Sequence, residues 1–216
     1  MNPPVWQESL RDRFAAIRAD RLHPYAWIVR DNVREAVQSC FPEFCRLRGG
    51  DELQRDVEHF IRHHAASRAP YVDLATEFML ATKDKLNEKQ KVAIEYEWCL
   101  IDCDMDARHV PPPPATSTAV LQVTTNPTLR LLATPFDLLG GAWSTNSAAG
   151  PSSPYVYGVF RDHRHTVITS ALTRNDVNRM LSLATSGNCT PPDDWTKTKL
   201  ALGLLVPGRS NNGETS

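Results

Sequence analysis

Residues 39–53 read SCFPEFCRLRGGDEL, and they join two amphipathic helical patterns. From Tyr25 to Cys40, apolar residues recur every three or four positions, which is the spacing of one continuous helical face. Pro42 cannot donate to a helical ladder, and it disfavours helical geometry at the residue before it. The sequence therefore predicts a helix that ends near Cys40 and is followed by a turn, with a further change of direction at the glycine pair at 49–50.

Further helical patterns extend on both sides of this turn. Asp51 is a candidate cap for a second helix, whose apolar face continues to His64. Similar stripes occur upstream over 6–17 and downstream over 74–81 and 86–105. Each stripe has to be buried against another one, so residues 1–110 are predicted to form an N-terminal helical bundle.

The composition changes at Pro111–Pro114, a run that cannot lie inside a helix. We expect a proline-rich linker at 111–118, a small mixed α/β domain at 119–206 with a short antiparallel sheet, and a disordered tail at 207–216. The chain is thus predicted to be an α+β protein. Within the second domain, strands are predicted at 119–125, 129–133, 155–160 and 166–170, a loop at 140–154, and helices from 173 and over 195–205.

Length and composition are those of a globular protein: 216 residues, of which 41% are hydrophobic and 23% charged. The N-terminus lacks the basic opening and apolar run of a secretory signal, and no stretch reaches the ~18 apolar residues of a membrane span. We therefore expect a cytoplasmic protein that does not engage a membrane. The five cysteines are odd in number and do not require disulfides.

The charge distribution argues against nucleic acid as a partner. Residues 1–70 hold 11 Arg and no Lys against 10 acidic residues, and residues 71–110 hold 5 basic against 9 acidic. The helical half is therefore net negative, at 16 − 19 = −3. Because binding to nucleic acid depends on neutralising phosphates, a helical DNA-binding or regulatory protein is the weaker alternative.

A cluster near the end of the helical half contains residue types that bind metals. It consists of Cys99, Asp102, Cys103, Asp104, Asp106 and His109. One interpretation is a stand-alone metalloprotein. We favour the other, in which the cysteines pack inward and the aspartates face solvent, because no second ligand pair at zinc spacing accompanies them. No metal site is therefore predicted in this chain.

The sequence contains none of the motifs of a self-sufficient enzyme. It has no GxSxG elbow, HExxH helix, phosphate-binding loop or GxGxxG turn. Taken alone, this absence is weak evidence that the chain has no catalytic residues and no cofactor of its own.

Several strings resemble the HvfC/BufC/MbnC family, whose members are helper subunits of iron-dependent peptide-modifying oxygenases. The strongest similarity covers 25–79, including SCFPEFCRLRGGDEL and HFIRHHAASRAPYVDLATEFM. Weaker, positional similarity follows at NPTLRLL (126–132), YVYGVFRDHRHTV (155–167), LTRNDVNRMLSLATSG (172–187) and WTKTKLALGLL (195–205).

The resemblance implies a helical domain followed by a small α/β domain, in a heterodimer with a TIM-barrel oxygenase that holds two or three iron ions. The chain is more similar to the methanobactin branch of the family than to its generic members. In that branch an MbnB-like partner converts cysteines of an MbnA-like, ribosomally made precursor peptide into oxazolone and thioamide groups, which bind copper. Iron is thus expected in the partner, and this chain is expected to be a non-catalytic accessory subunit that binds the leader of the precursor. Another precursor with another modification would fit the same residues.

Such a helper can hold a flexible peptide near the iron by adding it as a strand to an exposed sheet edge. The candidate edge is the predicted strand at 155–160, where Gly158 would permit close approach of a second backbone. Arginines beside it would pair with acidic leader residues. The alternative is an ordinary hairpin packed on the helix from 173, with the peptide bound elsewhere. The predicted peptide-binding residues are Tyr155, Val156, Tyr157, Gly158, Val159, Phe160, Arg161, Arg164 and Arg174.

The family-matched positions of the helical domain supply a predicted oxygenase interface, named from the resemblance alone. Phe41 and Phe78 are equally well explained as core residues. The predicted interface residues are Phe41, Pro42, Phe44, Pro70, Tyr71 and Phe78.

Overall fold

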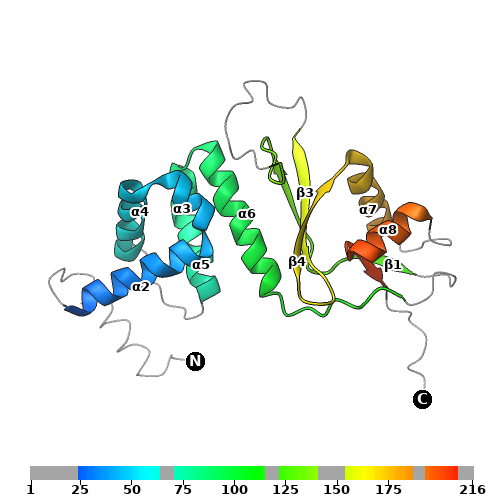
Figure 1. Cartoon of the computed structure of the whole chain (residues 1–216), viewed down its shortest axis with the longest axis horizontal. Coiled ribbons are helices and arrows are strands. Elements are labelled where there is room, and N and C mark those ends of the chain that lie inside the picture. The colour runs from blue at the N-terminus through cyan, green and yellow to red at the C-terminus, as the bar shows by residue number, and fades with distance from the viewer. Residues whose placement is uncertain (1–23, 64–70, 115–121, 141–153, 187–192, 209–216) are drawn as a thin grey trace, which may run out of the picture. The chain divides into compact units, whose positions relative to one another are not determined.

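The computed structural model describes residues 24–63, 71–114, 122–140, 154–186 and 193–208 (Figure 1). Over these ranges it contains seven α-helices and two small antiparallel sheets, with the bundle helices at the N-terminal side. The predicted α+β fold is therefore confirmed. The expected helix at 6–17, the 140–154 loop apart from its two ends, and the tail from 209 lie outside the described residues.

The chain divides into two compact units, Met1–Ile101 and Asp102–Ser216. The division falls inside the last turn of helix α6 (Glu88–Asp104), before the proline run that the sequence suggested as a linker. The predicted linker at 111–118 and the functions assigned to the two domains stay predictions.

The first unit contains the helices that the spacing predicts, with one more between them. Helix α2 (Pro24–Cys40) ends before Pro42, and α4 (Gly50–His63), α5 (Tyr71–Thr82) and a 3-10 turn (Lys83–Lys85) lead to α6. The segment expected to be a turn forms helix α3 (Pro42–Arg48). Proline is favourable in the first turn of a helix, where no intrahelical donor is needed, so Pro42 both ends α2 and begins α3.

Gly49 separates α3 from α4 in a way that only glycine allows easily. Its φ of +78° lies in the left-handed region. Helix α4 then begins at Gly50, so Asp51 lies in its first turn and is not its cap. The change of direction expected at the glycine pair is therefore present.

The second unit is built around a three-stranded sheet with the order β2-β3-β4. Its strands are β2 (Arg130–Thr134), β3 (Tyr155–Arg161) and β4 (Val167–Leu172), all antiparallel (Figure 1). A separate pair joins β1 (Val123–Thr125) to β5 (Leu205–Pro207). Helices α7 (Arg174–Ser186) and α8 (Asp194–Leu202) complete the unit.

The predicted helix at 195–205 is too long. Gly203 has a φ of +84° and ends α8, and the residues after it form β5. Pro207, assigned to the tail, pairs with Val123, and Gly208 N–H donates to Gln122 O at 2.7 Å. This strand was missed because its partner lies about eighty residues earlier, and local spacing carries no signal for such a pairing.

One hydrophobic core holds the second unit together. Its buried members come from β1, β3, β4, α7, α8 and the segment leading into β5: Val123, Phe160, Leu172, Met180, Leu200, Leu204 and Leu205. The residues of β3 and β4 in this core share one face of the sheet, so α7 and α8 cover that face.

Candidate functional site: an open edge of the sheet

Strand β3, the predicted peptide-accepting edge, is the central strand of its sheet. It pairs with β2 over Tyr155–Val159 and with β4 over Val156–Arg161. Its main-chain groups are therefore used on both sides, and the prediction that it is an exposed edge is wrong. Among the described residues, the edge strands of this three-stranded sheet are β2 and β4.

Most side chains of β3 are also inside the protein. Tyr157, Val159 and Phe160 are at most 1% exposed, whereas Tyr155 is 38% exposed. A Cβ at Gly158 would lie 3.1 Å from a methyl group of Leu129, so the room left by this glycine is filled by the protein's own core. Gly158 therefore serves internal packing, and the surface of β3 consists largely of Tyr155.

Strand β2 offers the better edge, because its exposed side chains and its free main-chain groups coincide. Asp162 N–H donates to Thr166 O at 2.9 Å where the β3–β4 hairpin closes. Along an antiparallel strand, the N–H and C=O groups of successive residues point to opposite neighbouring strands. In β3, those of the even-numbered residues therefore point toward β4, and those of the odd-numbered residues point toward β2. The odd-numbered residues pair with the even-numbered residues of β2. Leu131 and Ala133 therefore direct their N–H and C=O groups outward.

The side chains at these two positions are accessible. Leu131 is 53% exposed and Ala133 is exposed. They lie on the face of the sheet that the hydrophobic core covers at β3 and β4. Among the described residues, no further strand pairs with β2 on the side away from β3. The β2 edge, defined as the outward main-chain groups and side chains of Leu131 and Ala133, thus combines hydrogen-bonding capacity with apolar surface.

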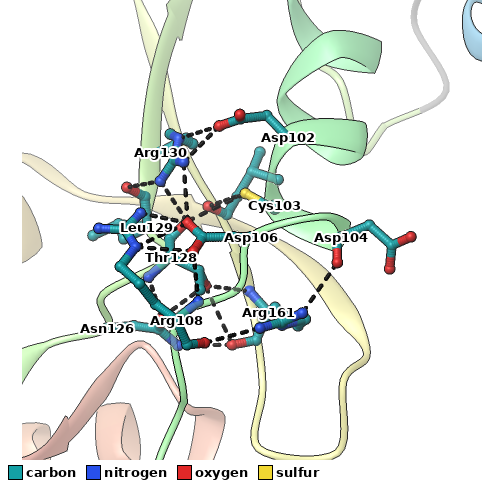
Figure 2. A network of polar contacts seen from close by, with 11 residues as sticks. Asp102, Cys103, Asp104, Asp106, Arg108, Asn126, Thr128, Leu129, Arg130 and Arg161 are labelled. Atoms are coloured by element: carbon teal, nitrogen blue, oxygen red, sulfur yellow. Dashed lines mark hydrogen bonds and ion pairs between the residues drawn. The ribbon is translucent and has the colours of Figure 1, made fainter. Parts of the chain in front are cut away.

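A network of charged groups fixes the start of β2. Arg130 donates from Nε to Asp102 Oδ2 at 2.6 Å and also binds Asp106 Oδ2 at 3.2 Å (Figure 2). Arg108 forks onto the same Asp106 carboxylate. Hydrogen bonds from Arg108, together with that from Arg130, hold the pKa of Asp106 well below its ordinary value, although burial opposes this. The network neutralises Arg130, so the first residue of β2 carries no free charge for a ligand.

Arg161, a predicted ligand of acidic leader residues, belongs to the same network. It is only 8% exposed, and it donates to Asp104 O at 3.0 Å and Arg108 O at 2.9 Å (Figure 2). These carbonyl groups lie at and after the C-terminus of α6, where a cation is favourable. Arg161 therefore ties this segment to the sheet and does not reach an external peptide.

The side chains of the Cys99–His109 cluster do not form one group, because they make contacts with different parts of the protein. The buried Cys103 thiol lies 3.2 Å from Thr128 O and 3.4 Å from Val159 O, and burial raises its pKa to about 11. Asp102 and Asp106 bind arginines, and Asp104 and His109 are exposed. Over the described ranges, no three metal-ligating side chains lie together in a group that could hold an ion.

The turn after β2 is anchored by Tyr157. Its hydroxyl donates to Asp137 Oδ1 and accepts from Leu138 N–H, both at 2.9 Å. Burial, together with the hydrogen bond to Asp137, raises the pKa of Tyr157 to about 12. This fully buried phenol fixes the end of the β2 edge nearest Thr134, as Arg130 fixes its beginning.

Three residues of the predicted oxygenase interface form the core of the first unit. Phe41, Phe44 and Phe78 are each 0% exposed. The rings of Phe41 and Phe78 stack with centroids 6.2 Å apart, and Phe60 meets Phe78 at 5.5 Å. Their assignment as contact residues is therefore wrong, and the core interpretation given for Phe41 and Phe78 applies to Phe44 as well.

The remaining interface candidates have different positions. Pro42 is exposed at the start of α3, Pro70 lies outside the described ranges, and Tyr71 is described only as the first residue of α5. Large apolar side chains do reach the surface of the first unit elsewhere. These are Trp27 at 62%, Ile28 at 52% and Leu80 at 63% exposure.

A buried carboxylate supports the aromatic core. Glu97 Oε1 accepts from Glu43 N–H at 2.7 Å, and Oε2 accepts from Phe44 N–H at 3.0 Å. It thus satisfies two free amides at the start of α3. Burial raises the pKa of Glu97 to about 7 in spite of these hydrogen bonds.

Comparison with protein-family models and with curated proteins finds no match for this chain. In the part of the chain that the structure describes, no helix is both long and apolar enough to cross a membrane.

Leu131 and Ala133 are the residues of this site that sequence reasoning missed. They fall in a short strand that the sequence did predict, and apolar residues in a predicted strand are ordinarily assigned to the core. The order β2-β3-β4 is what places them at an edge, and strand order is not encoded in local spacing.

Proposed function

We propose that this chain is a non-catalytic accessory subunit of the HvfC/BufC/MbnC type, which docks a ribosomally made precursor peptide for an iron-dependent oxygenase. The observation that carries this proposal is the β2 edge. Its two outward residues offer donors, acceptors and apolar side chains to an extended segment.

The leader segment adds to β2 as a further antiparallel or parallel strand. Its main chain bonds to the N–H and C=O groups of Leu131 and Ala133, and its apolar side chains pack beside theirs. Because Arg130 is already neutralised by Asp102 and Asp106, we expect recognition at this edge to be apolar rather than ionic.

Docking would favour the reaction because it raises the local concentration of the precursor's cysteines at the oxygenase and fixes their position. A peptide held by its leader presents its cysteines to the oxygenase at an effective concentration set by the connecting segment. In the methanobactin branch the products would be oxazolone and thioamide groups. The iron and the oxygen chemistry belong to the partner, and the complex acts in the cytoplasm.

The first unit supplies the partner surface in this proposal. The buried phenylalanines hold its helices, and the exposed apolar groups Trp27, Ile28 and Leu80 are the positions to probe for contact with the oxygenase. Pro42, exposed at the start of α3, remains a candidate from the family-matched positions.

Co-expression with an MbnB-like iron oxygenase tests the proposal. We expect a one-to-one complex, iron only when the oxygenase is present, and modification of the precursor that requires this chain. Ala133→Pro should preserve the complex but slow modification at limiting peptide by about tenfold, because it removes one outward donor. Iron bound stoichiometrically by this chain alone, or modification at full rate without it, would contradict the proposal.

A further inference from the structure

The guanidinium of Arg161 contains a buried donor that the protein does not use. Its Nη1 and Nη2 groups donate to Asp104 O at 3.0 Å and Arg108 O at 2.9 Å. Its Nε–H is buried as well, but it has no hydrogen-bond partner in the part of the chain that the structure describes. Leaving a charged donor buried and unsatisfied is costly, so such groups ordinarily bind protein, water or an ion. The Nε–H of Arg161 therefore needs an acceptor that the protein does not supply.

The polar groups beside Arg161 are already engaged with one another. Thr128 Oγ1 accepts from Arg161 N–H at 2.9 Å and donates to Asn126 Oδ1 at 2.8 Å. Asn126 Nδ2 donates to Arg161 O at 2.8 Å. Thr128 O accepts from Arg130 at 3.1 Å, and the Cys103 thiol also lies 3.2 Å from it. Turning one of these groups toward Nε would break a hydrogen bond that it already makes.

Arg161 also lacks a carboxylate that would balance its charge. It is only 8% exposed, and among the described residues no aspartate or glutamate pairs with it. The Asp104 side chain is exposed and points away from the guanidinium, which is bound by the main-chain oxygen of Asp104 instead (Figure 2). A buried ion without a counter-charge loses hydration that neutral acceptors replace only in part. A water molecule would satisfy the Nε–H but would leave this charge unbalanced.

The charges of the network around Arg161 do not cancel. In its described part, Arg108, Arg130 and Arg161 are accompanied by two bound carboxylates, those of Asp102 and Asp106. Both carboxylates are occupied by the other two arginines. The partial negative charge at the C-terminus of α6 offsets only part of the excess. The network therefore carries one net positive charge, and Arg161 is the arginine without an acidic partner.

We propose that the Nε–H of Arg161 binds a small monovalent anion of about the size of chloride. One negative charge matches the excess of the network, and a charge-assisted hydrogen bond satisfies the unused donor. The segment 104–109, which binds the guanidinium through its carbonyl groups, is largely exposed, so its local opening gives a free ion a path to the site. The burial of Arg161 excludes a peptide side chain as the ligand.

This anion site and the proposed peptide docking depend on different groups. The anion is bound by Arg161, whereas the β2 edge consists of the outward groups of Leu131 and Ala133. The anion stabilises the contacts between Arg161 and the segment that carries Asp106 and Arg108. Either proposal can therefore fail while the other stands.

The Nε–H signal of Arg161 in the isotopically labelled full chain reports on the site directly, because a buried N–H exchanges slowly with water. We expect sodium chloride to shift this signal saturably, with half-saturation on the order of 10 mM. Sodium gluconate at the same ionic strength, whose anion is too large for a buried site, should cause no saturable shift. Sodium formate, a second small monovalent anion, should compete with chloride. A signal that chloride leaves unchanged would show that water alone satisfies the donor, and it would overturn the inference.

Thermal unfolding gives a second readout with matched variants. At about 100 mM, chloride should raise the unfolding midpoint of the natural protein by about 3 to 6 °C relative to gluconate. The rise should vanish in Arg161→Gln and persist in Arg164→Gln, an exposed arginine three residues along the chain. An equal rise in Arg161→Gln would place the effect of chloride elsewhere and overturn the inference. Should Arg161→Gln fail to fold, the titration of the natural protein decides the question.

Discussion

The two units of this protein differ in where the residues singled out from the sequence lie. In the first, the aromatic string at Phe41 and Phe44 is closed inside a core with Phe60 and Phe78. In the second, the short strand β2, with the sequence RLLAT, leaves its outer edge accessible. The aromatic string therefore builds the core of the first unit, and the surface that we propose as the peptide-docking edge comes from an inconspicuous segment.

The largest expected effect follows from the closed aromatic core. Phe78→Ala removes a ring that contacts three other phenylalanines, so we expect the free energy of unfolding of the first unit to fall by about 3 to 5 kcal/mol. Denaturant titration measures this. Leu80→Ala, two residues along the same helix and 63% exposed, should cost no more than about 0.5 kcal/mol. A small loss for Phe78→Ala together with loss of the oxygenase complex would restore its role as an interface residue.

The buried carboxylate beneath this core predicts a pH dependence. The pKa of Glu97 is raised to about 7 from 4.5, so the folded protein holds a proton that the unfolded chain releases between these values. The stabilisation from Glu97 is therefore complete below pH 4.5 and is lost as the pH rises through 7.

Glu97→Gln should remove this dependence. Between pH 5 and pH 8 the unfolding free energy of the variant should gain about 2 kcal/mol relative to that of the natural protein. Glu95→Gln, in the same helix but paired with Lys83 near the surface, serves as the control. Parallel stability curves for Glu97→Gln and the natural protein would contradict the assignment.

Substitutions in the helices of the second unit should cost more stability than substitutions at the β2 edge. Asp176 caps α7 through Thr173 and binds Trp195 Nε1 at 2.6 Å and Lys199 at 3.1 Å. Burial opposes its ionisation, but these contacts together hold its pKa below the ordinary value. Asp176→Asn should cost about 2 kcal/mol near neutral pH.

This loss should shrink as the pH falls below the ordinary pKa of an aspartate, because the unfolded chain then takes up a proton that folded Asp176, with its lowered pKa, does not. Thermal unfolding at pH 7 and pH 3 measures the change. Asp194→Asn, at a fully exposed carboxylate in α8, should leave the transition unchanged at both pH values. An undiminished loss at pH 3 would show that packing, rather than charge, is responsible.

The smallest effect on stability is expected at the β2 edge itself. Ala133→Pro removes an N–H that faces outward, so the ladder to β3 is kept and the cost should stay below about 1 kcal/mol. Leu132→Pro, one residue earlier, removes an inward N–H and a buried side chain and should cost about 3 kcal/mol or more. Equal losses for the two variants would mean that the edge is not open.

Local sequence patterns predicted most of the elements and little of their arrangement. Helical spacing correctly placed α2, α4, α5, α6 and α7, because each apolar stripe repeats within a few residues. The β3–β4 hairpin was also predicted, since its strands are adjacent in the sequence. Helix α3 was missed because Pro42 was interpreted only as a helix breaker.

The candidate site could not be located in this way. Arg161 and Arg164 lie three residues apart in the sequence, yet one is buried against carbonyl groups and the other is exposed. Which strand forms the edge depends on the pairing of Arg130–Thr134 with a strand more than twenty residues later. Such pairings are set by tertiary packing, and the local pattern does not specify them.

The most direct test of the peptide-docking account is to titrate the unmodified precursor into isotopically labelled protein and follow the backbone amide signals. The account predicts the largest shifts at Leu131 and Ala133, slowed exchange of both amides in the complex, and binding weakened about tenfold in Ala133→Pro but not in the matched Ala171→Pro. Shifts distributed over the first unit with none at β2, or equal binding by Ala133→Pro, would contradict it.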